Sequence, residues 1–370
     1  MKWKIAKLGK IAIIKTGKLD SNAAVIGGRY PFFTCDPNTL SIDVWAYDTE
    51  AVLLAGNNAS GNYTAKYYKG KFNAYQRTYI IESANEEELN IRYLCYALNQ
   101  QLRLLKTMSS GSTTKFLTVR MLDNLDIPLP SINIQTEVVN ILSAYDDLIE
   151  NNQKQIKLLE EAAQRLYKEW FVNLRFPGHE NTKIVDGVPE GWKKERLVDI
   201  AEIQYGYAFD GTLFNADKNG TPIIRIRNIP QAETMDYTTE HVSENYLVQN
   251  GEIIVGMDGE FHINAWAGNT AYLVQRVCCI RPKNTEIKGW LLQAIYEPIK
   301  FFERTVVGAT VAHLGKKHLD SIYLLTSPEE FYEPFKTFFD KRLLLMNQNR
   351  KLREARDRLL PKLMSGEVEV

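Results

Sequence analysis

Two arginines and an asparagine lie within four residues of one another, at Arg225, Arg227 and Asn228, where the β-rich segment 221–228 ends. On a strand, Arg225 and Arg227 would point to the same face. Arginine can donate two hydrogen bonds to the edge of guanine, and asparagine can pair in the same way with adenine. These residues suggest base reading in a nucleic acid. The alternative is an exposed strand with solvated arginines.

An acidic turn, residues 256–261, follows another apolar run in the same half of the chain. Its glycines would let the backbone approach a groove closely, and Asp258 and Glu260 could accept hydrogen bonds from cytosine N4. Trp266 follows shortly after the turn and joins the candidate contacts. The alternative is a hairpin turn that uses glycine for its positive φ.

The first half of the chain has a turn of different composition at the corresponding place, residues 56–62. This turn is rich in amide and hydroxyl side chains, which suit direct reading of bases. A shared scaffold that presents different side chains is what recognition of a two-part element needs. We therefore predict nucleic-acid contacts from four of its residues: Asn57, Asn58, Ser60 and Asn62.

Small hydroxyl residues precede a short helix-forming segment in both halves, at residues 110–115 and 307–310. Backbone amides and hydroxyls at such a place can hold a phosphate group, so we predict phosphate contacts from Thr113 and Lys115. The alternative is an ordinary helix N-cap region. Three further residues complete the set of candidate contacts: Arg77, Tyr205 and Arg276.

No catalytic motif accompanies these residues. Gly-Lys pairs occur, but none is followed by the serine or threonine of a phosphate-binding loop. Residues 35–38 faintly resemble the Asn/Asp-Pro-Pro-aromatic motif of amino-methyltransferases, but they lack its second proline and its aromatic residue. The five histidines show no metal-ligand spacing. We therefore expect a non-catalytic chain without a metal or cofactor of its own.

Length and composition indicate a two-domain globular protein. The chain has 370 residues, of which 45% are hydrophobic, and its 45 basic side chains balance 45 acidic ones. A neutral chain is a poor bulk binder of polyanions, so a nucleic-acid surface would have to be local. No apolar run reaches the about 18 residues of a membrane span. Without a Cys-x-x-Cys pair, the four cysteines suggest buried thiols in a cytoplasmic protein.

The elements that would position the candidate residues occur twice. Each half has short β-rich runs between glycine and asparagine turns, followed by one helix, near residues 87–106 and 288–304. The runs are 51–54, 78–81, 223–226, 252–255 and 276–280. The two halves align at Trp3/Trp192, Gly17/Gly206, Arg77/Arg276, Gly111/Gly308, Leu117/Leu314 and Leu159/Leu352. Such a repeat indicates pseudo-two-fold symmetry, and duplex DNA is the commonest nearly two-fold partner.

A long amphipathic helix follows each half, over residues 135–171 and 329–360. Pro361 and Gly366 are expected to end the second helix. A seven-residue spacing runs through both helices: Tyr145, Asn152, Leu159 and Leu166 in the first, with Leu148, Ile156, Ala163 and Trp170 on its second seam, and Phe338, Leu345, Leu352 and Leu359 in the second. This pattern predicts that the two helices pair as an antiparallel coiled coil.

Polar residues share the second seam of the second helix, at Arg342, Asn349 and Arg356. An asparagine at a seam position fixes the register of two helices at some cost in stability. An arginine there could instead contact a protein outside the pair.

Several motifs resemble those of the specificity subunits of type I restriction–modification systems. They are residues 127–130 with Gln135 after them, 166–171, 175–180, 188–192, 256–261 and 360–366. The resemblance spans nearly the whole chain. The first half departs most, because its turn lacks the Asp-Gly-Glu-Phe of residues 258–261, and such variation is expected of domains that recognise different targets.

The resemblance implies an α/β (α+β) fold in which two pseudo-two-fold-related target-recognition domains are separated by the antiparallel coiled coil of the two long helices. It places the first recognition domain at 1–134, the central spacer helix and linker at 135–180, the second recognition domain at 181–327 and the C-terminal spacer helix at 328–370. Each domain would read one half of a bipartite site in double-stranded DNA, with the half-sites about 34 Å apart.

The resemblance also implies partners. They would be two methyltransferase subunits that use S-adenosylmethionine, and restriction–translocase subunits that use ATP and Mg²⁺. The competing hypothesis is a coiled-coil scaffold that holds two protein-binding domains and does not recognise DNA. The two hypotheses differ in whether the assembled complex binds DNA with an affinity that falls steeply with salt.

Overall fold

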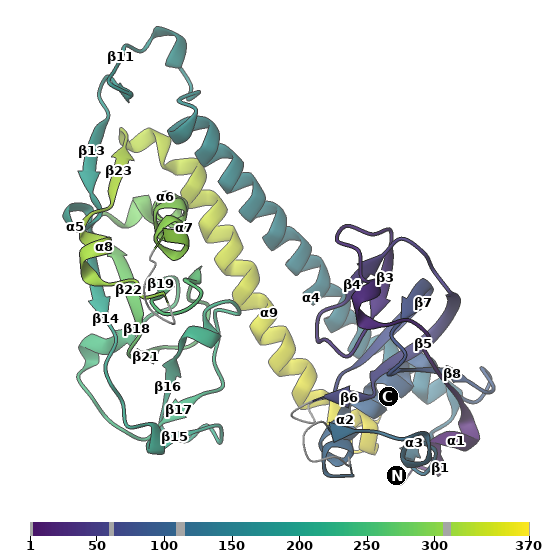
Figure 1. The fold of residues 1–370 in the computed structure, drawn as a ribbon. Helices are drawn as coiled ribbons and strands as arrows, with labels where there is room; N and C mark the ends of the chain where they lie inside the picture. The colour runs from purple at the N-terminus through teal and green to yellow at the C-terminus, as the bar shows by residue number, and fades with distance from the viewer. Residues whose placement is uncertain (1–2, 59–62, 109–114, 306–311, 370) are drawn as a thin grey trace. The chain divides into compact units, whose positions relative to one another are not determined.

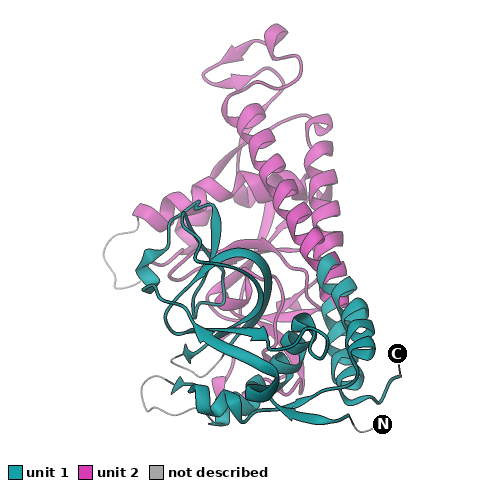
Figure 2. Cartoon of the chain, turned by 90° about the vertical axis from the view of Figure 1, so that its right-hand side faces the viewer, with its two compact units in different colours: residues 1–147, 353–370 teal, residues 148–352 magenta. Residues whose placement is uncertain are grey.

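The structure is a computed structural model that describes residues 3–58, 63–108, 115–305 and 312–369 (Figure 1). The chain divides into two compact units, which Figure 2 colours separately. Unit 1 comprises residues 1–147 and 353–370, and unit 2 comprises residues 148–352. The division falls inside both long helices, so each unit contains part of each helix. The four segments that the family resemblance implies, 1–134, 135–180, 181–327 and 328–370, stay a prediction.

Unit 1 is built on a six-stranded sheet with the order β2-β8-β5-β7-β3-β4. Neighbouring strands are antiparallel except β3 and β7, which are parallel. The pairs β1-β10 and β6-β9 form two small sheets. The strands are β1 (Ile5–Lys7), β2 (Ala12–Thr16), β3 (Tyr30–Phe33), β4 (Leu40–Ile42), β5 (Tyr47–Ala55), β6 (Asn57–Asn58), β7 (Ala65–Ala74), β8 (Thr78–Ser83), β9 (Lys115–Phe116) and β10 (Asp126–Pro128). The helices are α1 (Leu8–Ile11), α2 (Ile91–Met108) and α3 (Val119–Asp123), with a 3-10 turn, η1, at Ser21–Ala23.

The central strand β5 is buried on both faces. Val52 and Leu54 belong to the core cluster that includes Tyr93 of α2, whereas Leu53 belongs to a separate cluster with Phe72. Successive side chains of a strand point to opposite faces, so a strand covered on both sides is apolar without interruption. This explains the apolar run that predicted a strand at residues 51–54.

Unit 2 contains a four-stranded sheet, β14-β22-β19-β20, and a five-stranded sheet, β15-β17-β16-β21-β18. The strands of both sheets are β14 (Ala201–Tyr205), β15 (Phe214–Asn215), β16 (Thr221–Ile224), β17 (Tyr237–Thr238), β18 (Leu247–Val248), β19 (Ile253–Gly256), β20 (Ile263–Ala265), β21 (Ala271–Leu273) and β22 (Val277–Pro282). Two small sheets pair β11 (Ile184–Val185) with β12 (Val188–Pro189) and β13 (Lys193–Arg196) with β23 (Tyr323–Thr326).

The helices of unit 2, apart from the two long ones, are short. They are α5 (Leu197–Ile200), α6 (Lys288–Ala294), α7 (Tyr296–Thr305) and α8 (Lys316–Asp320). The single helix expected near residues 288–304 is thus two helices that meet at Ile295. Pro298 lies in the first turn of α7, where a helix tolerates proline because its missing N–H would have no partner there.

Strand β22 separates two cores in unit 2. Cys278 and Ile280 pack in the cluster that contains Trp290, and Val277 and Cys279 pack on the opposite face in the cluster that contains Trp266. Burial raises the pKa of the Cys278 thiol to about 12. These two neighbouring cysteines and Cys95 are therefore buried thiols, as predicted, whereas the prediction is wrong for Cys35, which is only partly buried.

The sequence repeat recurs as a repeat of backbone hydrogen bonds. The amides of Gly17 and Gly206 donate to the carbonyls of Thr78 (3.1 Å) and Val277 (3.0 Å), respectively. A Cβ atom on Gly17 would lie 2.2 Å from the Ala74 carbonyl oxygen, and one on Gly206 would lie 2.1 Å from that of Val274. Both copies therefore need glycine at this place, because another part of the backbone occupies the space of a side chain.

The aligned positions Arg77 and Arg276 accept equivalent backbone hydrogen bonds in the two copies. The carbonyl of Arg77 accepts from the Gly56 amide at 2.8 Å, and that of Arg276 accepts from the Met257 amide at 2.9 Å. Leu117 and Leu314 then donate to the carbonyls of Gly56 and Met257, at 2.8 and 2.7 Å. Asn57 and Asp258, the next residue in each copy, therefore stand at equivalent backbone positions.

The two long helices are α4 (Ile132–Tyr167), which continues as a π-helical turn over Lys168–Val172, and α9 (Glu333–Ser365). They pair in antiparallel fashion, because contacts that advance along α4 retreat along α9: Asp146 with Arg356, Asn152 with Asn349 and Glu160 with Arg342. Helix α9 runs through Pro361 and ends before Gly366, which has a φ of 72°. The expectation that Pro361 ends this helix is wrong.

The buried stripe of α4 departs from the predicted seam at one place. Leu148 was expected to face the partner helix, but it is 46% exposed, and Ile149 is buried instead. The buried face of a helix with 3.6 residues per turn shifts gradually relative to a strict seven-residue repeat, so the buried position can move to the neighbouring residue.

Both seam arginines of α9 have partners inside the chain. Arg356 donates to Asp146 at 2.7 Å and also to Asp357, and Arg342 donates to Glu160 at 2.7 Å. The seam asparagine, Asn349, accepts a hydrogen bond of 2.9 Å from Asn152, and both side chains are 2% exposed. None of the described helices has the length and apolar composition that crossing a bilayer requires.

The buried amide pair leads to a first prediction. Asn349→Ala leaves the amide of Asn152 buried without its acceptor, so we expect a loss of about 1–3 kcal/mol in the free energy of unfolding. Replacing Asn152 and Asn349 together with leucine removes both polar groups and should cost less than the single change. Denaturant unfolding of the three proteins measures this, and a single variant as stable as wild type would contradict it.

Candidate nucleic-acid interface

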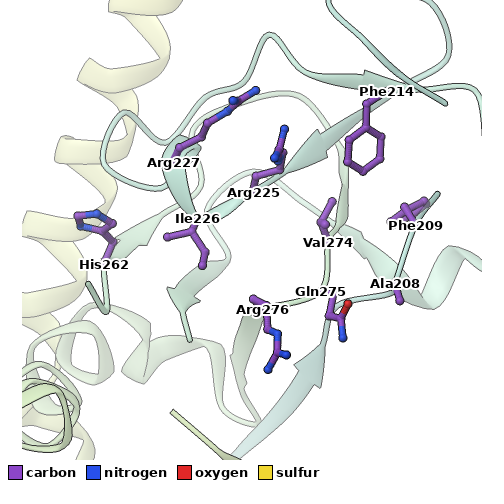
Figure 3. Close-up of a pocket in the computed structure, with 10 residues that line it drawn as sticks. All are labelled: Ala208, Phe209, Phe214, Arg225, Ile226, Arg227, His262, Val274, Gln275 and Arg276. Carbon is purple, nitrogen blue, oxygen red and sulfur yellow. The ribbon is translucent and has the colours of Figure 1, made fainter. Parts of the chain in front are cut away.

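Three of the predicted contact residues line one open pocket in unit 2. Arg225, Arg227 and Arg276 surround a hollow of about 560 Å³ (Figure 3). Their segments differ: Arg225 and Arg227 follow β16, and Arg276 lies between β21 and β22. The remaining lining residues are Ala208, Phe209, Phe214, Ile226, His262, Val274 and Gln275. The fold thus gathers guanidinium groups that are far apart in the sequence.

The segment that carries Arg225 and Arg227 is not the strand that the sequence predicted. Strand β16 ends at Ile224, and Ile226–Asn228 form a 3-10 turn, η5. The side-chain oxygen of Asn228 accepts a hydrogen bond of 2.8 Å from the Arg225 amide and so holds this turn. The prediction that the two arginines share a strand face is therefore wrong, but both still line the pocket.

Asp236 fixes this turn from the other side. Its carboxylate accepts two hydrogen bonds from the Arg227 guanidinium, at 2.5 and 3.1 Å, and one of 3.2 Å from the Asn228 amide group. Burial alone would raise the pKa of Asp236, but the hydrogen bonds from Arg227 and Asn228 hold it below its ordinary value. With its amide nitrogen on Asp236 and its oxygen on the Arg225 backbone, Asn228 serves to build the turn.

Arg225 is differently placed. Its guanidinium lies over the ring of Phe214, 5.5 Å from the ring centre, in a cation–π contact. Within the described residues it has no ion-pair partner. Its hydrogen-bond donors are therefore the most available of the three arginines for an incoming acceptor.

Arg276 forms a charged cluster with Asp258 and His313. Its Nε lies 3.2 Å from one Asp258 oxygen, and Nδ1 of His313 lies 2.5 Å from the other. The side chains of Arg276 and His313 are 50% and 45% exposed. Arg276 adopts a φ of 74°, a backbone conformation that is rare for residues with a side chain. Such strain is found where the surrounding structure holds a functional residue in place.

Glu260 projects from the same loop as Asp258. Its side chain is 65% exposed, and its carboxylate lies 3.5 Å from Nδ1 of His262, one of the pocket-lining residues. The loop between β19 and β20 therefore presents one carboxylate that is engaged with Arg276 and another that faces solvent.

Two predicted contact residues belong to the interior of unit 2. Trp266 is fully buried in the core, and its indole N–H donates to the Asn269 carbonyl at 2.8 Å. The Tyr205 hydroxyl is buried on β14, and burial raises the pKa of Tyr205 to about 12. A nucleic acid cannot reach these polar atoms, so we correct both assignments.

Unit 1 presents a different set of side chains at the equivalent places. Asn57 and Asn58 form β6, which pairs with Lys115 and Phe116 of β9. Asn57 faces Phe116 across this ladder, as Asp258 faces His313 in unit 2. Arg77 is exposed beside them. Ser60, Asn62 and Thr113 lie outside the described residues.

The aromatic residues that line the pocket were not predicted from the sequence. Phe209 and Phe214 line the pocket, and Phe209 contacts Tyr207, with 5.0 Å between ring centres. Tyr207 also contacts Tyr246. The alternation of aromatic and small residues at positions 205–209 was the available signal, because aromatic side chains offer surfaces on which bases can stack.

The side chains around the pocket are suited to binding hydrogen-bond acceptors. The three guanidinium groups can donate to phosphate or to guanine, and the phenylalanines offer apolar faces. Among the described residues, no three His, Cys, Asp or Glu side chains come together as a metal site would require. The charge and hydrogen-bond donors of the arginines make this pocket suited to anionic or acceptor-rich partners.

Comparisons with known proteins identify the family. The sequence matches the type I restriction modification DNA specificity domain over residues 1–161 and 189–330. It is 32% identical over 224 residues to the EcoDI specificity subunit of Escherichia coli, which covers 54% of this chain and 49% of that protein. It is 27% identical over 296 residues to the MjaIX specificity subunit of Methanocaldococcus jannaschii, which covers 75% of this chain and 68% of that protein.

The fold resembles the crystal structure of a type I restriction–modification system S subunit from M. genitalium. The TM-score is 0.62 at 16% identity, over 98% of this chain and 96% of that one. The match to the E. coli relative spans about half of that protein, 49%. Since the family match covers most of the chain, the chain belongs to the type I restriction modification DNA specificity domain family.

The ion pair in the 225–236 turn leads to a prediction about acidity. The lowered pKa of Asp236 means that its contribution to stability is full above the ordinary carboxyl pKa of 3.8 and is lost as the pH falls through its lower folded-state value. We expect Asp236→Asn to cost about 1–2 kcal/mol of unfolding free energy at neutral pH. The difference from wild type should shrink in acid.

Unfolding measured across the pH range tests this. The matched control is Asp199→Asn, which breaks the more exposed Arg196–Asp199 pair and should change stability less. A difference between wild type and Asp236→Asn that grows as the pH falls would contradict the assignment.

Proposed function

We propose that this chain is the non-catalytic specificity subunit of a type I restriction–modification complex, and that each α/β domain reads one half of a bipartite site in double-stranded DNA. The family match and the duplicated framework support the proposal. The pocket of unit 2 would receive DNA groups through Arg225, Arg276 and the Phe214 face. Arg227 would act mainly by holding the turn through Asp236.

The proposal of a bipartite site rests on one structural observation. At equivalent backbone positions, unit 2 places Asp258 opposite His313 and unit 1 places Asn57 opposite Phe116. The backbone hydrogen bonds around these positions are alike in the two units. One scaffold that holds different donors and acceptors at the same place would favour different bases. A pseudo-symmetric protein built this way would recognise an asymmetric site.

The long helices would serve as the spacer between the two recognition domains. We propose that 1–134 and 181–327 are the recognition domains and that 135–180 and 328–370 supply an antiparallel coiled coil that relates them by a pseudo-two-fold axis. The complex would work in the cytoplasm. Two methyltransferase subunits with S-adenosylmethionine, and restriction–translocase subunits with ATP and Mg²⁺, would assemble on this chain and supply the catalysis.

A domain exchange tests the division of labour. We expect that replacing residues 1–140 with the equivalent segment of another specificity subunit changes one half of the methylated motif and leaves the other half unchanged. Sequencing of methylated bases after co-expression with the modification subunits provides the readout. A motif without two parts, or one that changes in both halves, would contradict the proposal.

Substitution of a pocket arginine tests the surface itself. Arg276→Met removes one cation from the proposed interface, so the assembled complex should bind DNA more weakly. If Arg276 contacts a phosphate, the logarithmic salt dependence should also fall by about one unit. Filter binding at several salt concentrations measures both quantities.

Arg196→Met is the matched control for this measurement. Arg196 is also about half exposed, at 48%, and is also paired with an aspartate, but it does not line the pocket. Equal losses for Arg276→Met and Arg196→Met would show that net charge and not this surface governs binding. An affinity of the wild-type complex that does not depend on salt would favour the protein-binding scaffold instead.

A further inference from the structure

A buried arginine connects the helix pair to the arginine pocket of unit 2. Arg342 of α9 is 9% exposed, and its guanidinium donates to Glu160 of α4 at 2.7 Å. It also donates to the side-chain oxygen of Asn264 on β20, again at 2.7 Å. A single side chain thus bridges both long helices and the sheet of the recognition domain.

Asn264 in turn binds the segment that carries Arg225 and Arg227. It is 7% exposed, and its amide group donates to the carbonyls of Ile229 and Pro230 at 3.0 and 3.1 Å. Ile229 directly follows the 3-10 turn Ile226–Asn228 and is completely buried. The side-chain oxygen of Asn264 accepts from Arg342 and from the Ala265 amide, so both ends of this amide are engaged.

The far side of the same segment is anchored independently of the helices. The Asp236 carboxylate holds Arg227 and Asn228, and the Asp236 carbonyl accepts from the Ile223 amide at 2.9 Å. Asn264 therefore provides a hydrogen-bonded link between this segment and the helix pair, and Asp236 holds the segment's own shape. Loss of the Asn264 link should shift the segment as a body without unfolding it.

Because Arg342 is buried, its guanidinium can pair only with the protein groups that surround it. A guanidinium that is removed from water depends on partners in the protein, and those of Arg342 are bonded through Nε and Nη2, whereas its Nη1 is buried without a hydrogen-bond partner. Glu160 provides the counter-charge and Asn264 provides a neutral acceptor. The position of Asn264 relative to the two helices is thus set by a short charge-assisted hydrogen bond.

We propose that Arg342 is a positioning residue for DNA recognition: through Asn264 it sets the place of the 225–236 segment, and so of Arg225 and Arg227, against the helix pair. This inference rests on the proposed function, because it assumes that the pocket reads one half-site. It assigns to a residue of the spacer helix an effect on sequence discrimination at that half-site alone.

The test uses the assembled complex of the full chain with its modification subunits. Methylation rates are compared between the cognate DNA and variants with one changed base in either half-site. We expect Arg342→Met to lower discrimination about tenfold at the half-site read by unit 2, since small displacements of positioned groups cost this much or more. Discrimination at the other half-site should stay at the wild-type value.

A second variant interrupts the same path at its next step. Asn264→Asp keeps the acceptors for Arg342 and the Ala265 amide but removes the donors to Ile229 and Pro230. The carboxylate oxygen that replaces the amide nitrogen would face the carbonyl oxygens of Ile229 and Pro230, so the variant should lower discrimination at the same half-site while it keeps its contact with Arg342. A purely structural role predicts instead that discrimination falls in both half-sites together, in step with a lower melting temperature of the complex.

Two matched controls separate positioning from general damage to α9. Arg356→Met removes another seam arginine, whose partners Asp146 and Asp357 lie on the long helices. Asn347→Ala removes a reciprocal amide pair with Asn250, which connects α9 to the loop between β18 and β19, away from the 225–236 segment. Both controls should keep wild-type discrimination in the unit 2 half-site.

The outcomes are distinct. Loss in both half-sites with Arg342→Met, no loss with Asn264→Asp, or an equal loss with Asn347→Ala would each overturn the inference and leave the proposed function standing. A wild-type complex that methylates no bipartite motif would overturn the proposed function and this inference with it. Thermal melting of each complex identifies variants that fail to fold. If Arg342→Met fails to fold, the discrimination measured with Asn264→Asp tests the inference in its place.

Discussion

Neither unit completes its hydrophobic core without side chains from both long helices. In unit 1, Val138 and Leu142 of α4 and Leu363 and Met364 of α9 belong to the same buried cluster as the sheet. In unit 2, Phe171, at the end of the α4 segment, and Phe335 of α9 do the same. Burial of such side chains contributes about 1.5–3 kcal/mol each, so the helices are part of each domain's stability.

This constraint explains why polar residues are tolerated along the helix pair. A seam of leucines would bind more strongly, but it would not distinguish one register from the next. The Asn152–Asn349 pair and the Glu160–Arg342 and Asp146–Arg356 pairs each find their partners in one register only. Because both cores depend on that register, the cost of burying polar groups in the seam secures the packing of the domains.

The repeat shows how one backbone plan can support two different surfaces. Gly17 and Gly206 are needed for the same close approach of backbone segments, and Leu117 and Leu314 close the same loop. These requirements are steric and act on the main chain, so they persist in both copies. The side chains that project from the loops, such as those of Asn57 and Asp258, are not restricted in this way, and they differ between the two copies.

Periodicity along the chain was sufficient to predict the long helices, the inner strands and the existence of two copies, because these patterns are local and arise from the geometry of helix and strand. It was not sufficient to predict that Trp266, which follows a turn in the sequence, is buried in a core. It also did not predict that the strand ends at Ile224, where the side chain of Asn228 accepts from the Arg225 amide and stabilises a turn. Long-range packing decided the convergence of Arg225, Arg227 and Arg276 on one pocket and the path from Arg342 through Asn264. Such contacts join residues that are distant in the sequence, so only the tertiary path of the chain determines them.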